Sequence, residues 1–211
     1  MAQVTDYGTL KAWVSTTGHR GDLAGDIPGF IQDAETMIAD SVRAIELVTT
    51  AALVEADRDA GAVYNLPPDF LGARAVTGTL SGEAYEVKQV SIAELYRYSK
   101  SGDPVVFSVY GAQLEFRASP AVDAAFTLIY FKRPAAFVAD ADTNLLIQRH
   151  PILYQHASMY WFHIHTQDLE LSGVHRDAFG FYVEEVNAQA EEIRGTGVVN
   201  PHANFHSGAT M

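Results

Sequence analysis

Two stretches near the start of the chain repeat apolar side chains at the spacing of an α-helix. The first spans residues 5–17, can be capped by Thr5 or Asp6, and is followed by Gly18, which suits a helix stop. The second carries Pro28 in its first turn, where a missing N–H costs no hydrogen bond. Its apolar stripe contains Phe30, Ile31, Ala34, Met37, Ile38, Val42 and Ile45. A helical hairpin is therefore predicted to open the chain.

The middle of the chain replaces this spacing with short, β-branched segments that Gly and Pro interrupt, which is typical of strands. Turns are predicted at Ser81-Gly82 and Gly111-Ala112, each between two alternating segments. The predicted strands lie within residues 46–56, 61–67, 73–90, 104–119 and 124–134.

Two motifs within this β-rich part predict a corner and a short helix. The sequence Pro-Pro-Asp-Phe at residues 67–70 predicts a rigid corner at a strand end, because proline cannot donate to a sheet ladder. Asp69 suits the turn, and Phe70 can return to the core. Further on, Ser91 and the glutamate three residues later match a capping box before a two-turn helix over 92–99.

The helical spacing returns after Asn144. Residues 150–167 are apolar almost all round, which predicts a helix buried on more than one side. A last helix is predicted over 172–194, apolar first and acidic later. Residues 195–211 show no period and are expected to form an extended tail.

Together these elements predict an α+β protein, in which an α-helical bundle of N- and C-terminal helices carries an inserted small antiparallel β-sheet domain and an extended C-terminal tail. The expected divisions are a helical hairpin over 1–45, a β-rich insert over 46–140, C-terminal helices over 141–194 and the tail over 195–211.

Composition narrows the class of protein. The 211 residues contain no cysteine, so disulfides and thiolate metal sites are excluded, and no apolar run reaches the length of a membrane span. The first ten residues show no signal-peptide pattern. The net charge of −12 makes general binding to phosphate backbones unfavourable, since that binding needs Lys and Arg.

Several segments resemble, in the same order, the head-to-tail adaptor proteins of tailed bacteriophages. The opening helix and polar loop "DYGTLKAWVSTTGHRGDL" are followed by "IPGFIQDAETMIADSVRAIELVTTAAL" and by the Leu-Pro-x-Asp-Phe-Leu corner. Then come "VSIAELYRY", "VFSVYGAQLEFRASP", "LIYFKRPAAF" and "TNLLIQRHPILYQHASMYW". The resemblance covers roughly residues 5–192.

The resemblance implies a structural function without catalysis or cofactors. Such adaptors form a homo-oligomeric ring, a dodecamer, beneath the portal protein; they extend the DNA channel and present a platform to nozzle or tube proteins of the tail. The chain is then expected in the virion at the portal–tail joint, assembled in the host cytoplasm, with DNA passing unbound and no membrane partner. Alternatives are another tail-tube or tail-completion protein and, less favoured, a metal-dependent hydrolase.

Histidines are the candidates for a metal site: His150, His156, His163, His165 and His175. On a helix His156 and His163 share a face, whereas His163 and His165 point ~200° apart. No His-Glu-x-x-His arrangement accompanies them, so packing or hydrogen bonding between subunits is the favoured interpretation, and no metal site is predicted.

Other catalytic patterns are missing from the sequence. No Gly-x-Ser-x-Gly occurs, and the glycines of residues 195–197 lack the Lys and Ser/Thr of a phosphate-binding loop. No catalytic or cofactor-binding residue is therefore predicted.

The remaining candidates are surfaces for assembly. The aromatic residues of the third long helix are predicted to lie in the core or at a subunit interface: Tyr154, Tyr160, Trp161 and Phe162. Four acidic residues are predicted to face the channel or solvent: Glu184, Glu185, Glu191 and Glu192. In the tail, Val198, Val199 and Phe205 are the expected anchors to the portal, with His202 and His206 hydrogen-bonding at the subunit boundary.

Overall fold

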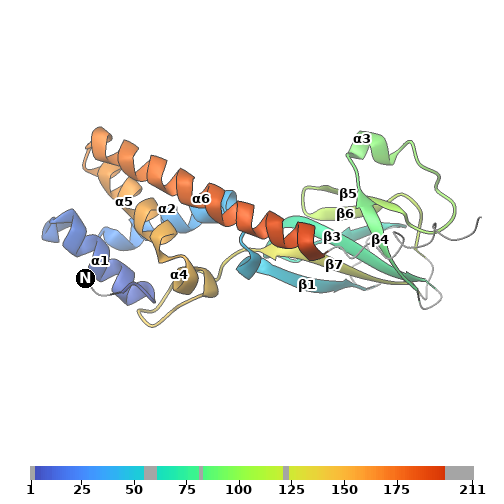
Figure 1. Cartoon of the computed structure of the whole chain (residues 1–211), viewed down its shortest axis with the longest axis horizontal. Coiled ribbons are helices and arrows are strands. Elements are labelled where there is room, and N and C mark those ends of the chain that lie inside the picture. The colour runs from blue at the N-terminus through green and yellow to red at the C-terminus, as the bar shows by residue number, and fades with distance from the viewer. Residues whose placement is uncertain (1–2, 55–60, 81–82, 121–123, 198–211) are drawn as a thin grey trace, which may run out of the picture.

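The computed structural model describes residues 3–54, 61–80, 83–120 and 124–197. It confirms an α+β protein, with long helices at one end and a seven-stranded sheet at the other (Figure 1). The helices are α1 (Tyr7–Gly18), α2 (Ile27–Ser41), α3 (Ile92–Leu95), α4 (Leu145–Arg149), α5 (Pro151–His165) and α6 (Leu169–Gly197). Single 3-10 turns form η1 (Gly21–Leu23) and η2 (Ile45–Leu47).

The N-terminus of α1 is set by a reciprocal cap. Asp6 accepts a hydrogen bond from the Thr9 backbone at 2.8 Å, and the Thr9 hydroxyl accepts one from the Asp6 backbone at 3.1 Å. Gly18 is the last helical residue, and His19 after it takes the left-handed conformation with φ 52°. Gly18 therefore does not stop the helix by its own conformation. A Cβ at this position would lie 2.4 Å from the ring of Phe162, so close packing requires glycine.

The second predicted helix is shorter than its apolar stripe. Pro28 lies in the first turn of α2 as expected, but α2 ends at Ser41, and Ile45 lies in η2. The reason is tertiary: the Asn187 side chain, from α6, accepts from the Arg43 backbone N–H at 2.7 Å and donates to the Ser41 carbonyl at 3.0 Å. These bonds hold the chain where it leaves the helix.

The seven strands form one sheet in the order β1-β7-β3-β4-β5-β6-β2. Their bounds are β1 (Val48–Leu53), β2 (Val63–Asn65), β3 (Phe70–Leu80), β4 (Glu83–Gln89), β5 (Val106–Tyr110), β6 (Gln113–Phe116) and β7 (Ala125–Lys132). Gly111 turns the β5–β6 hairpin with φ 56°, as predicted. The predicted turn at Ser81-Gly82 lies outside the described residues, between the antiparallel β3 and β4.

The prediction of an antiparallel sheet is wrong at one pairing, because β4 and β5 run parallel. The segment between them crosses over through α3, whose Leu95 is buried with Val90 and Val106. The helix predicted over 92–99 is a single turn, ending at Leu95. The Ser91 hydroxyl caps it by accepting from the Glu94 backbone at 3.2 Å.

The sheet curls until distant strands meet face to face. The rings of Phe116 on β6 and Phe126 on β7 lie 4.7 Å apart, although β7, β3, β4, β5 and β6 follow one another in the sheet order. A second aromatic contact closes the same core, with Tyr85 against Phe126 at 6.4 Å. A Cβ on Gly78 would lie 2.7 Å from both of these rings, so glycine is needed between them.

The helical end is organised around α5, which contacts α1, α2, α4 and α6. This agrees with its apolar sequence. The α6 helix begins at Leu169, earlier than predicted, because the Asp168 carboxylate accepts from the Leu171 backbone at 3.1 Å. It also ends later than predicted, so residues 195–197 belong to α6; the rest of the predicted tail lies outside the described residues.

Candidate functional site

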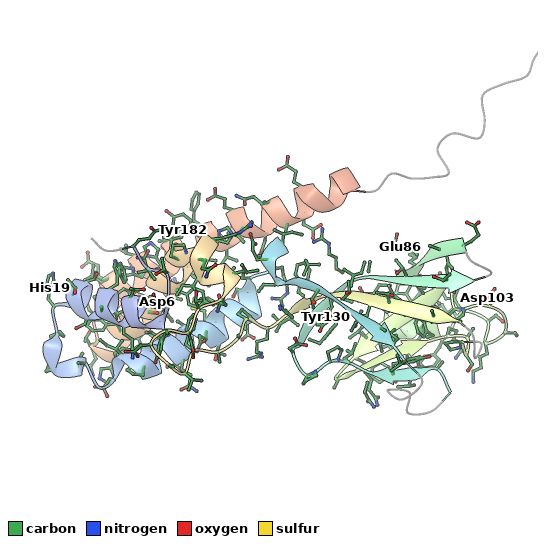
Figure 2. The ribbon with its side chains drawn as sticks, turned by 90° about the horizontal axis from the view of Figure 1, so that it is seen from below. Asp6, His19, Glu86, Asp103, Tyr130 and Tyr182 are labelled. Atoms are coloured by element: carbon green, nitrogen blue, oxygen red, sulfur yellow. The ribbon has the colours of Figure 1, made fainter. Side chains whose placement is uncertain are left out.

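The corner at residues 67–70 connects β2 to β3 and packs on the end of β7. The Tyr130 hydroxyl donates to Asp69 at 2.9 Å, and Phe70 stacks on Tyr130 with ring centroids 5.7 Å apart. Desolvation and this hydrogen bond raise the pKa of Tyr130 to about 12, so its proton stays in place. Figure 2 places Tyr130 where the sheet meets the helices. The Asp69 carbonyl also accepts from the Arg133 backbone at 2.7 Å, which ties the corner to the end of β7.

Of the four aromatic candidates on α5, two are committed to the chain's own core. Tyr154 is fully buried, and its hydroxyl accepts from the Asn144 amide at 3.1 Å. Burial raises the pKa of Tyr154. Phe162 is 2% exposed and meets Phe30 edge to face. Tyr160 and Trp161 are partly exposed, so they alone of the four keep surface for a neighbour.

Three of the five candidate histidines meet between α5 and α6. The Nδ1 atoms of His156 and His175 lie 2.9 Å apart, and His163 stacks on His175 at 5.3 Å between ring centroids. His156 also stacks on Tyr182, which Figure 2 shows on α6. The sequence pattern placed His156 and His163 on one face but gave no sign that His175 completes the cluster.

The geometry of this cluster suits neutral imidazoles. One Nδ1 must donate and the other accept, so His156 and His175 cannot both be charged and keep their bond. Burial lowers the pKa of His156, His163 and His175, and the neighbouring imidazoles lower that of His175 further, to about 4. Within the described ranges, no three His, Asp or Glu side chains are arranged to hold a metal ion.

The other two histidines lie apart. His165 is exposed and rests on Phe30, with ring centroids 5.1 Å apart. His150 approaches the buried carboxylate of Glu46 at 3.6 Å, and Arg149 binds the same carboxylate at 3.1 Å. These residues fasten α4 to η2.

The acidic candidates all lie on the exposed side of α6: Glu184, Glu185, Glu191 and Glu192. The opposite side of this helix is anchored through Asn187 at the end of α2 and through Arg74 of β3, which donates to the Ala190 carbonyl at 3.4 Å. The helix therefore extends from the helical end towards the sheet (Figure 1) with its carboxylates outward.

The sequence analysis did not identify an exposed apolar surface on α6. Leu171, Val174 and Phe181 on α6 are 43%, 57% and 63% exposed, more than any of the aromatic candidates on α5. Their spacing of three and then seven residues puts them on one stripe of the helix. That spacing could have revealed a second apolar face, separate from the face that carries Phe179 and Val186 into the core.

The tail candidates cannot be placed. Val198, Val199, His202, Phe205 and His206 lie outside the described residues.

Comparison with protein families shows the class of protein to which this α+β chain belongs. Residues 5–201 match the family described as SU10 adaptor protein, a family of phage head-to-tail adaptors. The chain belongs to this family, which confirms the resemblance seen in its motifs. A search of curated proteins returned no match. Among the described helices, none combines the length and apolar character that crossing a membrane requires.

Proposed function

We propose that the chain forms a homo-oligomeric ring, a dodecamer, between the portal and the tail of a phage virion and extends the DNA channel there. Membership of the SU10 adaptor family is the observation that carries this proposal, because it covers nearly the whole chain and implies a structural adaptor of the virion rather than an enzyme. Portal and tail proteins are the partners that this family implies.

The acidic surface of α6 supports the channel part of the proposal. A channel that passes DNA should not hold it, and carboxylates repel the phosphate backbone where Lys and Arg would bind it. We therefore propose that the stretch from Glu184 to Glu192 faces the channel. The net charge of −12 acts in the same direction.

The C-terminal residues 198–211 are proposed to dock on the portal. Their few strong apolar side chains, Val198, Val199 and Phe205, would fill small grooves, and His202 and His206 would hydrogen-bond at the subunit boundary. A segment with so few apolar residues becomes ordered only where a partner supplies the surface.

The test combines purified chain with purified portal rings and images the product by electron microscopy. The expected result is a closed ring of the chain on one face of the portal, continuous with its channel. Binding to tail proteins alone, with no affinity for the portal, would overturn the portal–tail assignment and favour a tail-completion role.

A further inference from the structure

Phe181 forms an exposed apolar knob with carboxylates around it. Its side chain is 63% exposed on α6, and Val174 precedes it on the same stripe. The residues one turn away on this helix include the exposed Glu184 and Glu185, and Asp177, which pairs with Arg176 at 3.7 Å. A complementary surface would be an apolar hollow with a basic rim.

The chain carries such a hollow elsewhere. A cavity of about 200 Å³ opens between η2, α4 and the segment that joins β7 to α4. Its apolar walls are Leu47, Pro134, Ala135, Leu145 and Leu146, and Leu145 is 58% exposed. An apolar cavity of ~150 Å³ holds a benzene ring, so this one admits a phenylalanine side chain.

The rim of the hollow is basic. Lys132 lines it, is exposed and has no ion pair within the described part of the chain. The next residue, Arg133, lines a different hollow, against Gln32 and Glu35 of α2. Glu46 also lines the hollow, but Arg149 pairs with it at 3.1 Å. The knob and the hollow are therefore complementary in both apolar character and charge.

The two surfaces lie on opposite sides of the helical end. In Figure 1 α6 runs along one side and α4 lies on the other, and α5, which contacts both, lies between them. Phe181 therefore cannot reach the hollow of its own chain. A closed ring requires this arrangement, because each subunit presents one face to one neighbour and a different face to the other.

We propose that Phe181 of one copy inserts into the hollow at Leu145 of the next copy, with the carboxylates of Glu184 and Glu185 facing Lys132. This joint rests on the ring of the proposed function and assigns its subunit contact. Glu184 and Glu185 begin the stretch that we propose faces the channel, and in this joint they lie at its channel edge, where they meet Lys132 of the next copy.

Crosslinking tests the joint directly. Phe181 is replaced by the photo-crosslinking amino acid benzoylphenylalanine, and equal amounts of ¹⁴N- and ¹⁵N-labelled full-length chain are assembled on portal rings. Mixed-isotope crosslinks from position 181 to residues 132–149 are expected. Crosslinks to portal or tail peptides, or only within one chain, would overturn the joint.

Charge exchange provides a second test. Lys132→Glu is expected to weaken assembly on the portal at least ten-fold, and adding Glu185→Lys to the same chain should restore it, because each joint then regains an opposite-charge pair. Lys88→Glu, a reversal on exposed β4, is the matched control and should assemble normally. Thermal melting of each monomer checks the fold.

The experiments distinguish failure of the proposed joint from failure of the proposed adaptor function. If wild-type chain forms rings on the portal and Lys132→Glu and Phe181→Ser assemble equally well, the joint is wrong and the adaptor function stands. If wild-type chain shows no assembly with the portal, both are overturned.

Discussion

The Nδ1 atoms of His156 and His175 lie 2.9 Å apart between α5 and α6, so one Nδ1–H must donate a hydrogen bond that the other Nδ1 accepts. Stacking of His163 on His175 and of His156 on Tyr182 extends this contact along the two helices. The α5–α6 hairpin therefore depends on imidazoles that stay neutral.

This cluster predicts a loss of stability in mild acid. Burial and the two other imidazoles lower the pKa of His175 from its ordinary value of 6.5 to about 4. The unfolded chain therefore binds more protons between these values, and the stability present above pH 6.5 is lost as the pH falls towards 4. Burial lowers the pKa of His163, and the nearby Asp168 carboxylate offsets only part of this effect. His175 should account for a loss on the order of 2 kcal/mol at pH 4.

The measurement is chemical denaturation at several pH values for the wild type and for His175→Gln. The variant keeps a polar group at this position but does not titrate, so its stability should fall less between pH 6.5 and 4. Other carboxylates contribute to acid unfolding in both proteins, which is why the difference between the two curves is the readout. Parallel curves would show that the cluster does not titrate with folding.

Gly18→Ala should destabilise the helical end. The new Cβ would lie 2.4 Å from the Phe162 ring, and overpacking of this kind costs about 1–3 kcal/mol. Gly29→Ala is the matched control, because nothing lies within 4 Å of a Cβ at this position in α2, and it should be neutral or stabilising. In a Phe162→Leu background the cost of Gly18→Ala should shrink. Equal costs in both backgrounds would contradict the clash.

Asn187→Ala should loosen the docking of α6. The side chain bonds the Arg43 N–H and the Ser41 carbonyl, and leaving those partly buried groups without partners costs about 1–3 kcal/mol. Gln189→Ala, at an exposed position on the same helix, should change the free energy of unfolding little. Hydrogen exchange at the Arg43 amide should rise in the first variant alone. An unchanged rate there would show that Asn187 does not hold the end of α2.

The predictable parts of this fold are those with local causes. The Asp6 cap, Pro28 in the first turn of α2 and the left-handed Gly111 all follow from the chemistry of neighbouring residues. The features that the sequence did not predict depend on contacts between residues far apart in the chain. Asn187 ends α2 from more than a hundred residues away, and the α3 crossover makes β4 and β5 parallel.

The same distinction applies to the candidate surfaces. Helical spacing correctly placed His156 and His163 on one face, but only tertiary packing brings His175 against them. The aromatic character of Tyr154 did not distinguish core from interface, because both bury apolar surface; the fold places it in the core. Exposed Phe181 was overlooked because it lies in the apolar first part of this helix, and only the fold shows which of those apolar side chains face outward.

The acidic end of α6 predicts an effect on DNA passage. Glu191 and Glu192 lie beyond the knob around Phe181, so they are the residues to change without disturbing the proposed joint. With both replaced by Lys, the ring should assemble normally and DNA ejection should slow several-fold at low salt, since each new cation can bind a phosphate. Replacement by Gln removes charge without adding attraction and should have a smaller effect. Wild-type ejection rates at low salt for the Lys variant would show that these positions do not meet DNA.

Removal of residues 198–211 should separate folding from docking. Truncation after Gly197 keeps every described element, so the monomer should melt at the wild-type temperature. Its affinity for the portal should fall at least ten-fold, because a segment of this length spans about 45 Å when extended and carries the only proposed portal anchors. A full-length chain with Val198, Val199 and Phe205 changed to Ser should behave like the truncation. One with Asn200 and Asn204 changed to Ser should dock normally. Wild-type affinity of the truncated chain would show that the portal contact lies elsewhere on the adaptor.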